Sequence, residues 1–138
     1  MTRYLLDTNI VSELRRVKPH GAVLAWIQTL RPEQIFISAV TIGELQTGVE
    51  LTRKNDPAKA NEIEDWLNQI EASLAALAMD SRCFREWARL MVGRSGAYSE
   101  DAMIAATGRV HGLVVATRNE RDFRPFQVPV LNPFQFEG

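Results

Sequence analysis

The sequence predicts an α/β fold: a three-layer α/β/α sandwich around a central, mainly parallel sheet of four to five short strands. Two observations indicate this class. Short apolar runs alternate along the chain with segments of helical spacing, which is the pattern of βαβ units. Each run is apolar without interruption, as strands are when helices cover both faces of a sheet. Ligands of such sheets bind beyond the carboxyl ends of the strands, so a functional site is expected at that edge.

The composition is that of one globular domain, which we expect to span residues 1–138. The chain is 46% hydrophobic and has a formal net charge of −1. A chain of this length buries roughly 70% of its unfolded surface, so it needs no metal or disulfide to fold. The single cysteine, Cys83, excludes an internal disulfide and a cysteine-based zinc site. No signal peptide or membrane span is recognisable, so a cytoplasmic location is expected.

The first part of the chain reads as one strand followed by two helices. Tyr4–Leu6 is short and apolar, and predicts a strand. Thr8 or Asn9 is expected to cap the next helix, which runs toward Pro19. Apolar residues then recur at intervals of three and four over Val23–Leu30, which predicts a second helix.

The middle of the chain predicts two more strands with two helices between them. Ile35–Ser38 is rich in β-branched and aromatic residues, and helical spacing resumes over residues 42–49. Pro57 suits the first turn of a long amphipathic helix, whose apolar stripe begins at Ile63. Leu77–Met79 is the expected third strand.

The last part of the chain predicts two helices and two strands. Asp80 and Ser81 are expected to cap one helix. Ser99 is expected to cap the other, and Gly112 to end it. The two strands that close the sheet are then Leu113–Thr117, the most strand-like segment of the chain, and an edge strand at Val128–Leu131.

Polar side chains gather at these strand ends and in the first turns of the following helices. They are mostly acids and amides, with no histidine or lysine among them: Asp7, Glu44, Glu100, Asp101, Thr117, Arg118, Asn119 and Asp122. Each has an ordinary structural explanation, such as a turn at Asp7 or a Thr41–Glu44 capping box. Together they predict a cation site, because clustered carboxylates repel each other and raise each other's pKa unless a cation lies among them.

The types of ligand predict which metal binds. Carboxylate and amide oxygens, without cysteine or histidine, suit Mg²⁺ or Mn²⁺ and suit zinc poorly. Such an ion can activate a water molecule for attack on a phosphodiester and neutralise charge on the phosphorus oxygens. The expected reaction is therefore metal-assisted phosphodiester hydrolysis.

Four stretches, in order and together spanning most of the chain, carry a family resemblance. They are LLDTNIVSEL (Leu5–Leu14), ISAVTIGELQTGV (Ile37–Val49), DAMIAATGRVHGLVVATRNERDF (Asp101–Phe123) and VLNPF (Val130–Phe134). In these stretches the chain resembles PIN-domain ribonucleases, most of all the VapC toxins of bacterial toxin–antitoxin pairs, in their FitB-like branch. The resemblance implies a PIN-like fold and an endoribonuclease toxin that depends on Mg²⁺ or Mn²⁺.

The resemblance also implies roles for individual residues. Asp7, Glu44 and Asp101 match the family's first three acidic positions, which would bind the metal directly or through water. Asn119 falls at the fourth acidic position and completes the expected catalytic set, although it offers a carbonyl oxygen without a charge. Further candidates for metal binding or support of the metal site are Asp122, Thr8, Asn9 and Thr117.

An acidic site that binds RNA needs basic residues at its rim. Arg118 is the expected substrate contact because it follows the last long strand directly. Arg82, Arg85 and Arg89 share one helix face, either as phosphate contacts or as ordinary solvated surface. The resemblance implies two protein partners, a second copy of the chain in a homodimer and a cognate antitoxin of the VapB or FitA kind that covers the active site.

Two other functions compete with a nuclease. A receiver-type phosphoacceptor domain needs a lysine at the end of a late strand, and no lysine of this chain has that place. A non-catalytic PIN-fold module that binds RNA or a partner is the stronger alternative, because Asn119 lacks the fourth charge. Metal-dependent cleavage that is lost in Asp7→Asn distinguishes the two. RNA or DNA as substrate, and one metal ion or two, stay open at this point.

Overall fold

The computed structural model describes residues 1–138, and its five strands form one wholly parallel sheet. The strand order is β3-β2-β1-β4-β5. The strands are β1 (Tyr4–Leu6), β2 (Ile35–Ser38), β3 (Ala75–Leu77), β4 (Val114–Ala116) and β5 (Val130–Leu131). Leu6 of the central strand is aligned with Ile37 on one side and with Ala116 on the other. The predicted parallel sheet is confirmed.

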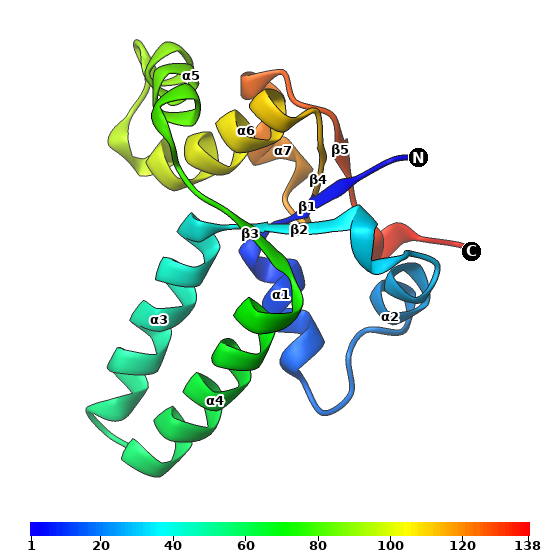
Figure 1. Cartoon of the computed structure of the whole chain (residues 1–138), viewed down its shortest axis with the longest axis vertical. Helices are drawn as coiled ribbons and strands as arrows, with labels where there is room; N and C mark the ends of the chain where they lie inside the picture. The colour runs from blue at the N-terminus through cyan, green and yellow to red at the C-terminus, as the bar shows by residue number, and fades with distance from the viewer.

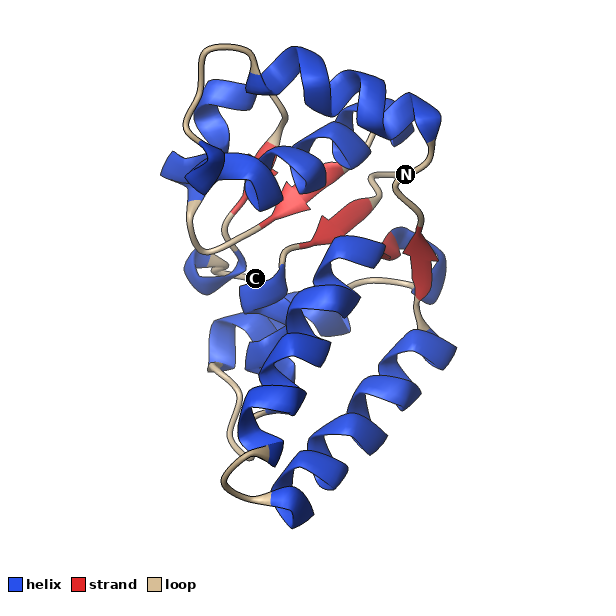
Figure 2. Ribbon diagram, turned by 90° about the vertical axis from the view of Figure 1, so that its left-hand side faces the viewer, coloured by secondary structure: helices blue, strands red, loops and turns tan.

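Helices cover both faces of this sheet. They are α1 (Thr8–Arg15), α2 (Gly21–Gln28), α3 (Ala39–Arg53), α4 (Pro57–Ser73), α5 (Ser81–Met91), α6 (Ser99–His111) and α7 (Glu120–Phe123). Figure 1 shows α5, α6 and α7 on one side of the sheet and α1 to α4 on the other, and Figure 2 shows the same division. The predicted three-layer sandwich is confirmed. None of the helices has both the length and the apolarity that crossing a bilayer requires.

The hydrophobic core is divided by the sheet into two large clusters. Successive strand residues point to opposite faces, so Leu5 and Val115 belong to the cluster under α5 and α6. Leu6 and Ala116 belong to the cluster on the α1 and α2 side. The three tryptophans pack into or against these clusters, as their helical spacing predicts: Trp26, Trp66 and Trp87. Uninterrupted apolar runs in the strands are therefore required, because both faces are buried.

The helix termini differ from the prediction at three places. Asp7, and not Thr8 or Asn9, is the N-cap of α1. Ser38 caps α3 by accepting the Val40 N–H at 3.1 Å, so the Thr41–Glu44 capping box is wrong and Glu44 lies in the second turn. Ser99 is the first residue of α6 and not its cap. At each of these three places the predicted cap residue lies one to three positions after the residue that caps the helix.

The third strand also differs, since it is Ala75–Leu77 and not Leu77–Met79. Ala76 pairs with Ile37 of β2, and both alanines of the strand are exposed at the edge of the sheet. The strand was predicted at the following residues because those residues have large apolar side chains. An edge strand needs no such side chains. The last strand, β5, is at the opposite edge, as predicted.

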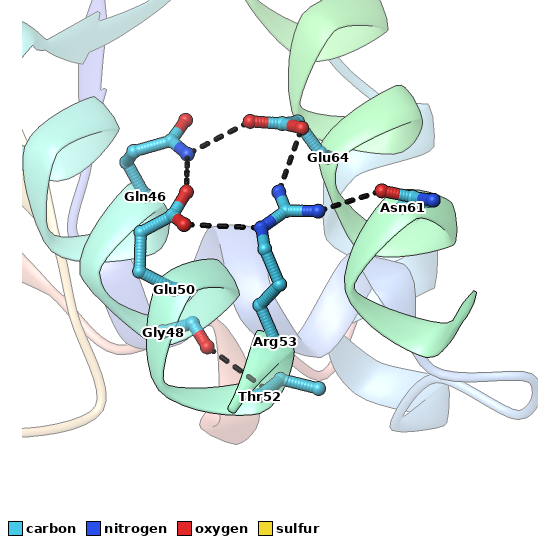
Figure 3. Close-up of polar contacts among 7 residues, drawn as sticks. All are labelled: Gln46, Gly48, Glu50, Thr52, Arg53, Asn61 and Glu64. Atoms are coloured by element: carbon cyan, nitrogen blue, oxygen red, sulfur yellow. Dashed lines mark hydrogen bonds and ion pairs between the residues drawn. The ribbon is translucent and has the colours of Figure 1, made fainter. Parts of the chain in front are cut away.

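Helices α3 and α4 form a hairpin that extends away from the sheet (Figure 2). It has a small core of its own, made by Val49, Ala60 and Leu67. Arg53 of α3 crosses to α4, where its Nη1 donates to Asn61 Oδ1 at 2.7 Å and its Nη2 to Glu64 Oε1 at 2.9 Å (Figure 3). Its Nε donates to Glu50 Oε1 at 3.0 Å. The hairpin is therefore fastened by contacts that do not involve the sheet.

Candidate functional site

Asp7 follows the central strand directly and is fixed at the carboxyl edge of the sheet. Its backbone N–H donates to Ala116 O at 2.9 Å, which continues the pairing of β1 with β4. The residue is only 6% exposed. Three donors hold its carboxylate: Thr8 N–H to Oδ1 at 2.8 Å, Thr117 Oγ1 to Oδ2 at 2.8 Å, and Asn9 Nδ2 to Oδ2 at 3.2 Å. The orientation of the Asp7 carboxylate is thus fixed by residues at the ends of two strands and in one helix. A residue that only forms a turn would not need so many contacts.

Glu44 reaches the same edge from α3 and is linked to Asp7 through one threonine. Thr8 Oγ1 donates to Glu44 Oε1 at 3.0 Å, while the Thr8 backbone N–H donates to Asp7. The Thr8 hydroxyl also lies 3.0 Å from the hydroxyl of buried Thr41. The predicted support residues Thr8, Asn9 and Thr117 thus all contact the carboxylates that they were expected to hold.

Asp101 and Asp122 complete the cluster from the other half of the chain. Asp101 lies in the first turn of α6, and Asp122 lies in α7. The charge of Asp122 acts on both Asp7 and Asp101. Asn119 stands just before α7, where its backbone N–H donates to Thr117 Oγ1 at 3.0 Å and its side chain caps nothing. Asp122 therefore brings a fourth negative charge to the site.

The pKa values of the three main carboxyls are all raised. Burial raises the pKa of Asp7, although hydrogen bonds from Thr117, Thr8 and Asn9 favour the ionised form. Burial also raises the pKa of Glu44 to about 7, with further contributions from the charges of Glu100 and Asp7.

Burial, followed by repulsion from Asp7, Asp122 and Glu100, raises the pKa of Asp101 to about 6. Ionising all of these carboxyls together is therefore costly unless a cation joins them.

No basic side chain supplies that cation. The ion pairs of the chain involve other acids, namely Glu13, Glu50, Glu64 and Glu86. The oxygen donors of the cluster fit Mg²⁺ or Mn²⁺. No three acidic, histidine or cysteine side chains lie close enough to hold one ion among them. An ion would therefore take one or two carboxylates directly and reach the others through water, as Mg²⁺ commonly does.

Arg118 lies at the rim of the carboxylate cluster, as predicted. Its backbone N–H donates to Asn9 Oδ1 at 3.3 Å, and its guanidinium carbon is 4.4 Å from the centroid of the Phe134 ring. It forms no ion pair. It lines a hollow of about 400 Å³ that has no hydrophobic lining residue and carries both signs of charge, from Arg121 and Arg124 and from Glu120 and Asp122. Because guanidinium groups bind phosphate oxygens in a bidentate manner, an Arg118 without an acidic partner is a candidate phosphate contact.

One functional contact was missed from the sequence, and one predicted group lies elsewhere. Glu100, which the sequence places among the polar residues of this edge, raises the pKa values of both Glu44 and Asp101. Phe134 belongs to the VLNPF stretch, but nothing in the sequence indicated its contact with Arg118, because the two segments are joined only by packing. Arg82 and the other arginines of α5 line neither of the two hollows beside the carboxylates.

Comparison with known proteins finds relatives that match this chain over most of its length. The family model of the PIN domain matches residues 4–127. Toxin FitB of Neisseria gonorrhoeae is 36% identical, with 94% of this chain and 97% of that protein covered. A VapC ribonuclease of Sinorhizobium fredii is 34% identical, with 95% of this chain and 97% of that protein covered.

A solved structure gives the same answer. The crystal structure of FitAcB from Neisseria gonorrhoeae superposes with a TM-score of 0.84 at 32% sequence identity, and covers 96% of this chain and 99% of that chain. Sequence and structure thus agree over nearly the full length, and the chain belongs to the PIN domain family, in the group of the VapC and FitB toxins.

Proposed function

We propose that the chain is the toxin of a toxin–antitoxin pair and that it hydrolyses RNA with the help of Mg²⁺ or Mn²⁺. The observation that carries this proposal is the meeting of Asp7, Glu44 and Asp101, with raised pKa values and no basic partner. When bound there, a divalent ion supplies charge neutralisation and activation of a water molecule. The ribonuclease name of a relative supports the same reaction.

The chain's own residues have separate tasks in this proposal. Asp7 and Asp101 would hold the ion, and Thr117 orients the Asp7 carboxylate by donating to its Oδ2 atom. Glu44 orients the attacking water, while Thr8 fixes the Glu44 carboxylate through its Oε1 atom. Arg118 holds a phosphate of the RNA at the rim, which brings the scissile phosphodiester next to the carboxylates.

The proposed partners are an antitoxin and a second copy of the chain. Similar solved structures include a toxin–antitoxin complex from Klebsiella pneumoniae and FitAB bound to a DNA fragment. An uncompensated acidic cluster would attract a basic side chain of an antitoxin, and such a contact would block the metal site. Adding an antitoxin of the FitA or VapB kind should therefore abolish cleavage, and unchanged cleavage in the complex would contradict this arrangement.

The experiment that tests the proposed activity uses the purified chain and total cellular RNA. Cleavage is expected with Mg²⁺ or Mn²⁺ and not with EDTA. Each cut should leave a 5′-phosphate on the downstream fragment and a 3′-hydroxyl on the upstream fragment. Asp7→Asn should remove the activity while the chain stays folded. Cleavage that persists in EDTA would contradict the metal proposal, and cleavage that persists in Asp7→Asn would contradict the site.

A second candidate function is a non-catalytic module that binds RNA or a partner. Asn119 favours it, because the fourth acidic position of the family carries no charge here. Asp122 argues against it, because its charge acts on the same carboxyls. RNA binding without turnover, in any divalent metal, would support this second function over the first.

A further inference from the structure

A basic hollow lies between α5 and α6, apart from the carboxylate site. Its volume is about 680 Å³. It is lined by four arginines and a single acid: Arg82, Arg85, Arg89 and Arg109, with Glu86. The chain as a whole has a net charge of −1, so this concentration of positive charge is local. Three of these arginines share helix α5, whereas Arg109 comes from α6 and was not predicted to join them.

Much of that positive charge is not neutralised within the chain. Glu86 accepts from Arg89 Nη1 at 3.3 Å and from Arg109 Nε at 3.3 Å. Arg82 and Arg85 form no ion pair. Asp80 lies close to Arg82 along the chain, but its carboxylate already caps α5 by accepting the Cys83 N–H at 3.0 Å. Two guanidinium groups are therefore free to bind an anion.

The lining indicates which part of a nucleic acid this hollow would take. Guanidinium groups bind phosphate oxygens in a bidentate manner, whereas unpaired bases stack on aromatic side chains. Only two of the ten lining residues are hydrophobic, and none is aromatic. We propose that the hollow between α5 and α6 binds the phosphate backbone of the RNA substrate, without reading its bases.

The hollow lies away from the carboxylate site, so it would be a second contact for the RNA and not a part of the cleavage site. Leu113 and Pro129, which line it, precede β4 and β5, so it lies at the amino edge of the sheet. Asp101 is near the start of α6 and Gly112 just beyond its end, which are about 16 Å apart at 1.5 Å per helical residue. An RNA held at both places would run along α6. This inference rests on the proposed ribonuclease function.

The test measures the binding of labelled single-stranded RNA to the whole chain in EDTA, by fluorescence anisotropy at several salt concentrations. The double substitution Arg82→Ala and Arg85→Ala should weaken binding about tenfold at low salt. The slope of log affinity against log salt should fall by about 1.4, at about 0.7 for each lost phosphate contact. The matched control is Lys54→Ala with Lys59→Ala, which removes the same charge from the α3–α4 hairpin and should leave the slope unchanged.

A second variant changes the charge of the hollow in the opposite direction. Glu86→Gln removes the only negative charge of the lining and keeps one acceptor oxygen in place of the two that accept from Arg89 and Arg109. RNA should then bind several-fold more tightly, with a steeper salt slope. A loss of folding cannot produce tighter binding, so this variant tests the hollow even if the double variant is unstable.

The outcomes separate this inference from the function on which it rests. If the wild-type chain cleaves RNA, and the double arginine variant loses no more affinity than the lysine control, the hollow is not an RNA site. The same holds if Glu86→Gln binds RNA no more tightly than the wild-type chain does. If the wild-type chain cleaves no RNA, the proposed function itself is wrong.

Discussion

Thr117 Oγ1 donates a 2.8 Å hydrogen bond to Asp7 Oδ2 across two neighbouring strands of the sheet, and both side chains are buried. The same hydroxyl oxygen accepts the Asn119 N–H at 3.0 Å. One threonine thus joins the carboxylate after β1 to the loop after β4, although these residues are 110 positions apart. The geometry of the carboxylate site therefore depends on the pairing of β1 with β4.

Thr117→Val keeps the shape of this side chain but removes its hydroxyl. We expect the free energy of unfolding to fall by about 1–3 kcal/mol, because Asp7 Oδ2 loses the shorter of its two hydrogen bonds and the Asn119 N–H loses its acceptor. The affinity for Mg²⁺ should fall as well, while Thr117→Ser should resemble the wild type. Urea denaturation and calorimetric titration measure these effects. An equal loss in the serine variant would show that the hydroxyl is not what matters.

Glu44→Gln should stabilise the metal-free chain at pH 8. The pKa of Glu44 is raised to about 7 from an ordinary value of 4.5, so its ionised form is unfavourable in the fold. Because the side chain is only half-buried, the gain is on the order of 1 kcal/mol. Thermal unfolding in EDTA measures it, with exposed Glu33→Gln as the control for loss of a carboxylate. Unchanged stability in Glu44→Gln would mean that the fold does not disfavour the ionised form of Glu44.

The stability of the metal-free chain should depend on pH in one direction. The pKa values of Glu44 and Asp101 are raised in the fold, to about 7 and about 6. The folded chain therefore binds more protons than the unfolded chain between about pH 4 and pH 7. The stabilisation is complete below pH 4 for these two groups and is lost as pH rises through 6 and 7. Denaturation in EDTA across this range should show it.

Mg²⁺ should reverse that dependence, because its ligands must first lose their protons. We expect metal affinity to rise from pH 5 to pH 8, and the stability in saturating Mg²⁺ to rise with it. Titration of the chain with Mg²⁺ at each pH measures the affinity. An affinity that does not change over this range would contradict the assignment of Glu44 and Asp101 to the metal.

Phe134 should act as a positioning residue for Arg118, whose guanidinium lies over its ring, while His20 packs against it at a centroid distance of 4.9 Å. Phe134→Leu should raise the KM for RNA about two- to fivefold, since a cation–π contact at an exposed site contributes about 0.5–1 kcal/mol. Phe134→Trp keeps an aromatic face and should restore the KM. An equal change in kcat in both variants would indicate a general structural role instead.

Asn119→Asp and Asp122→Asn test which residue supplies the fourth charge. Asp122 already acts on Asp7 and Asp101, so Asp122→Asn should weaken Mg²⁺ binding and lower the pKa of Asp101 in the metal-free chain. Asn119→Asp should strengthen Mg²⁺ binding only if the Asn119 side chain faces the ion. Calorimetry and NMR titration of the carboxyl groups measure both. Unchanged metal affinity in Asp122→Asn would return the fourth position to Asn119.

Much of the fold could be predicted from the sequence, because burial on both faces of the sheet forces uninterrupted apolar strands. Tyr4–Leu6 and Ile35–Ser38 were predicted with their observed bounds for this reason. Ala75–Leu77 was not, because it is an exposed edge strand that needs no large side chains. The helix caps were less predictable, since several polar residues in a row can each accept the first N–H groups.

The candidate site was predictable as a set of strand-end residues, because the end of a parallel strand is also the end of its neighbours. For this reason Glu44 and Asp101 both lie close enough to Asp7 for its charge to act on them. What the sequence could not show is contact between distant segments, such as Arg118 with Phe134 or Arg89 and Arg109 with Glu86. Such contacts follow from packing in three dimensions, and no local sequence pattern predicts them.

The strand order β3-β2-β1-β4-β5 has a consequence for the synthesis of this protein. The central strand is made first, but its neighbour β4 is the fourth strand to leave the ribosome. Until then Asp7 lacks the Thr117 hydroxyl and the Ala116 carbonyl that hold it. A nascent or truncated chain that stops before residue 114 cannot complete the site. The carboxylate site is therefore assembled only after β4 has been synthesised and has paired with β1.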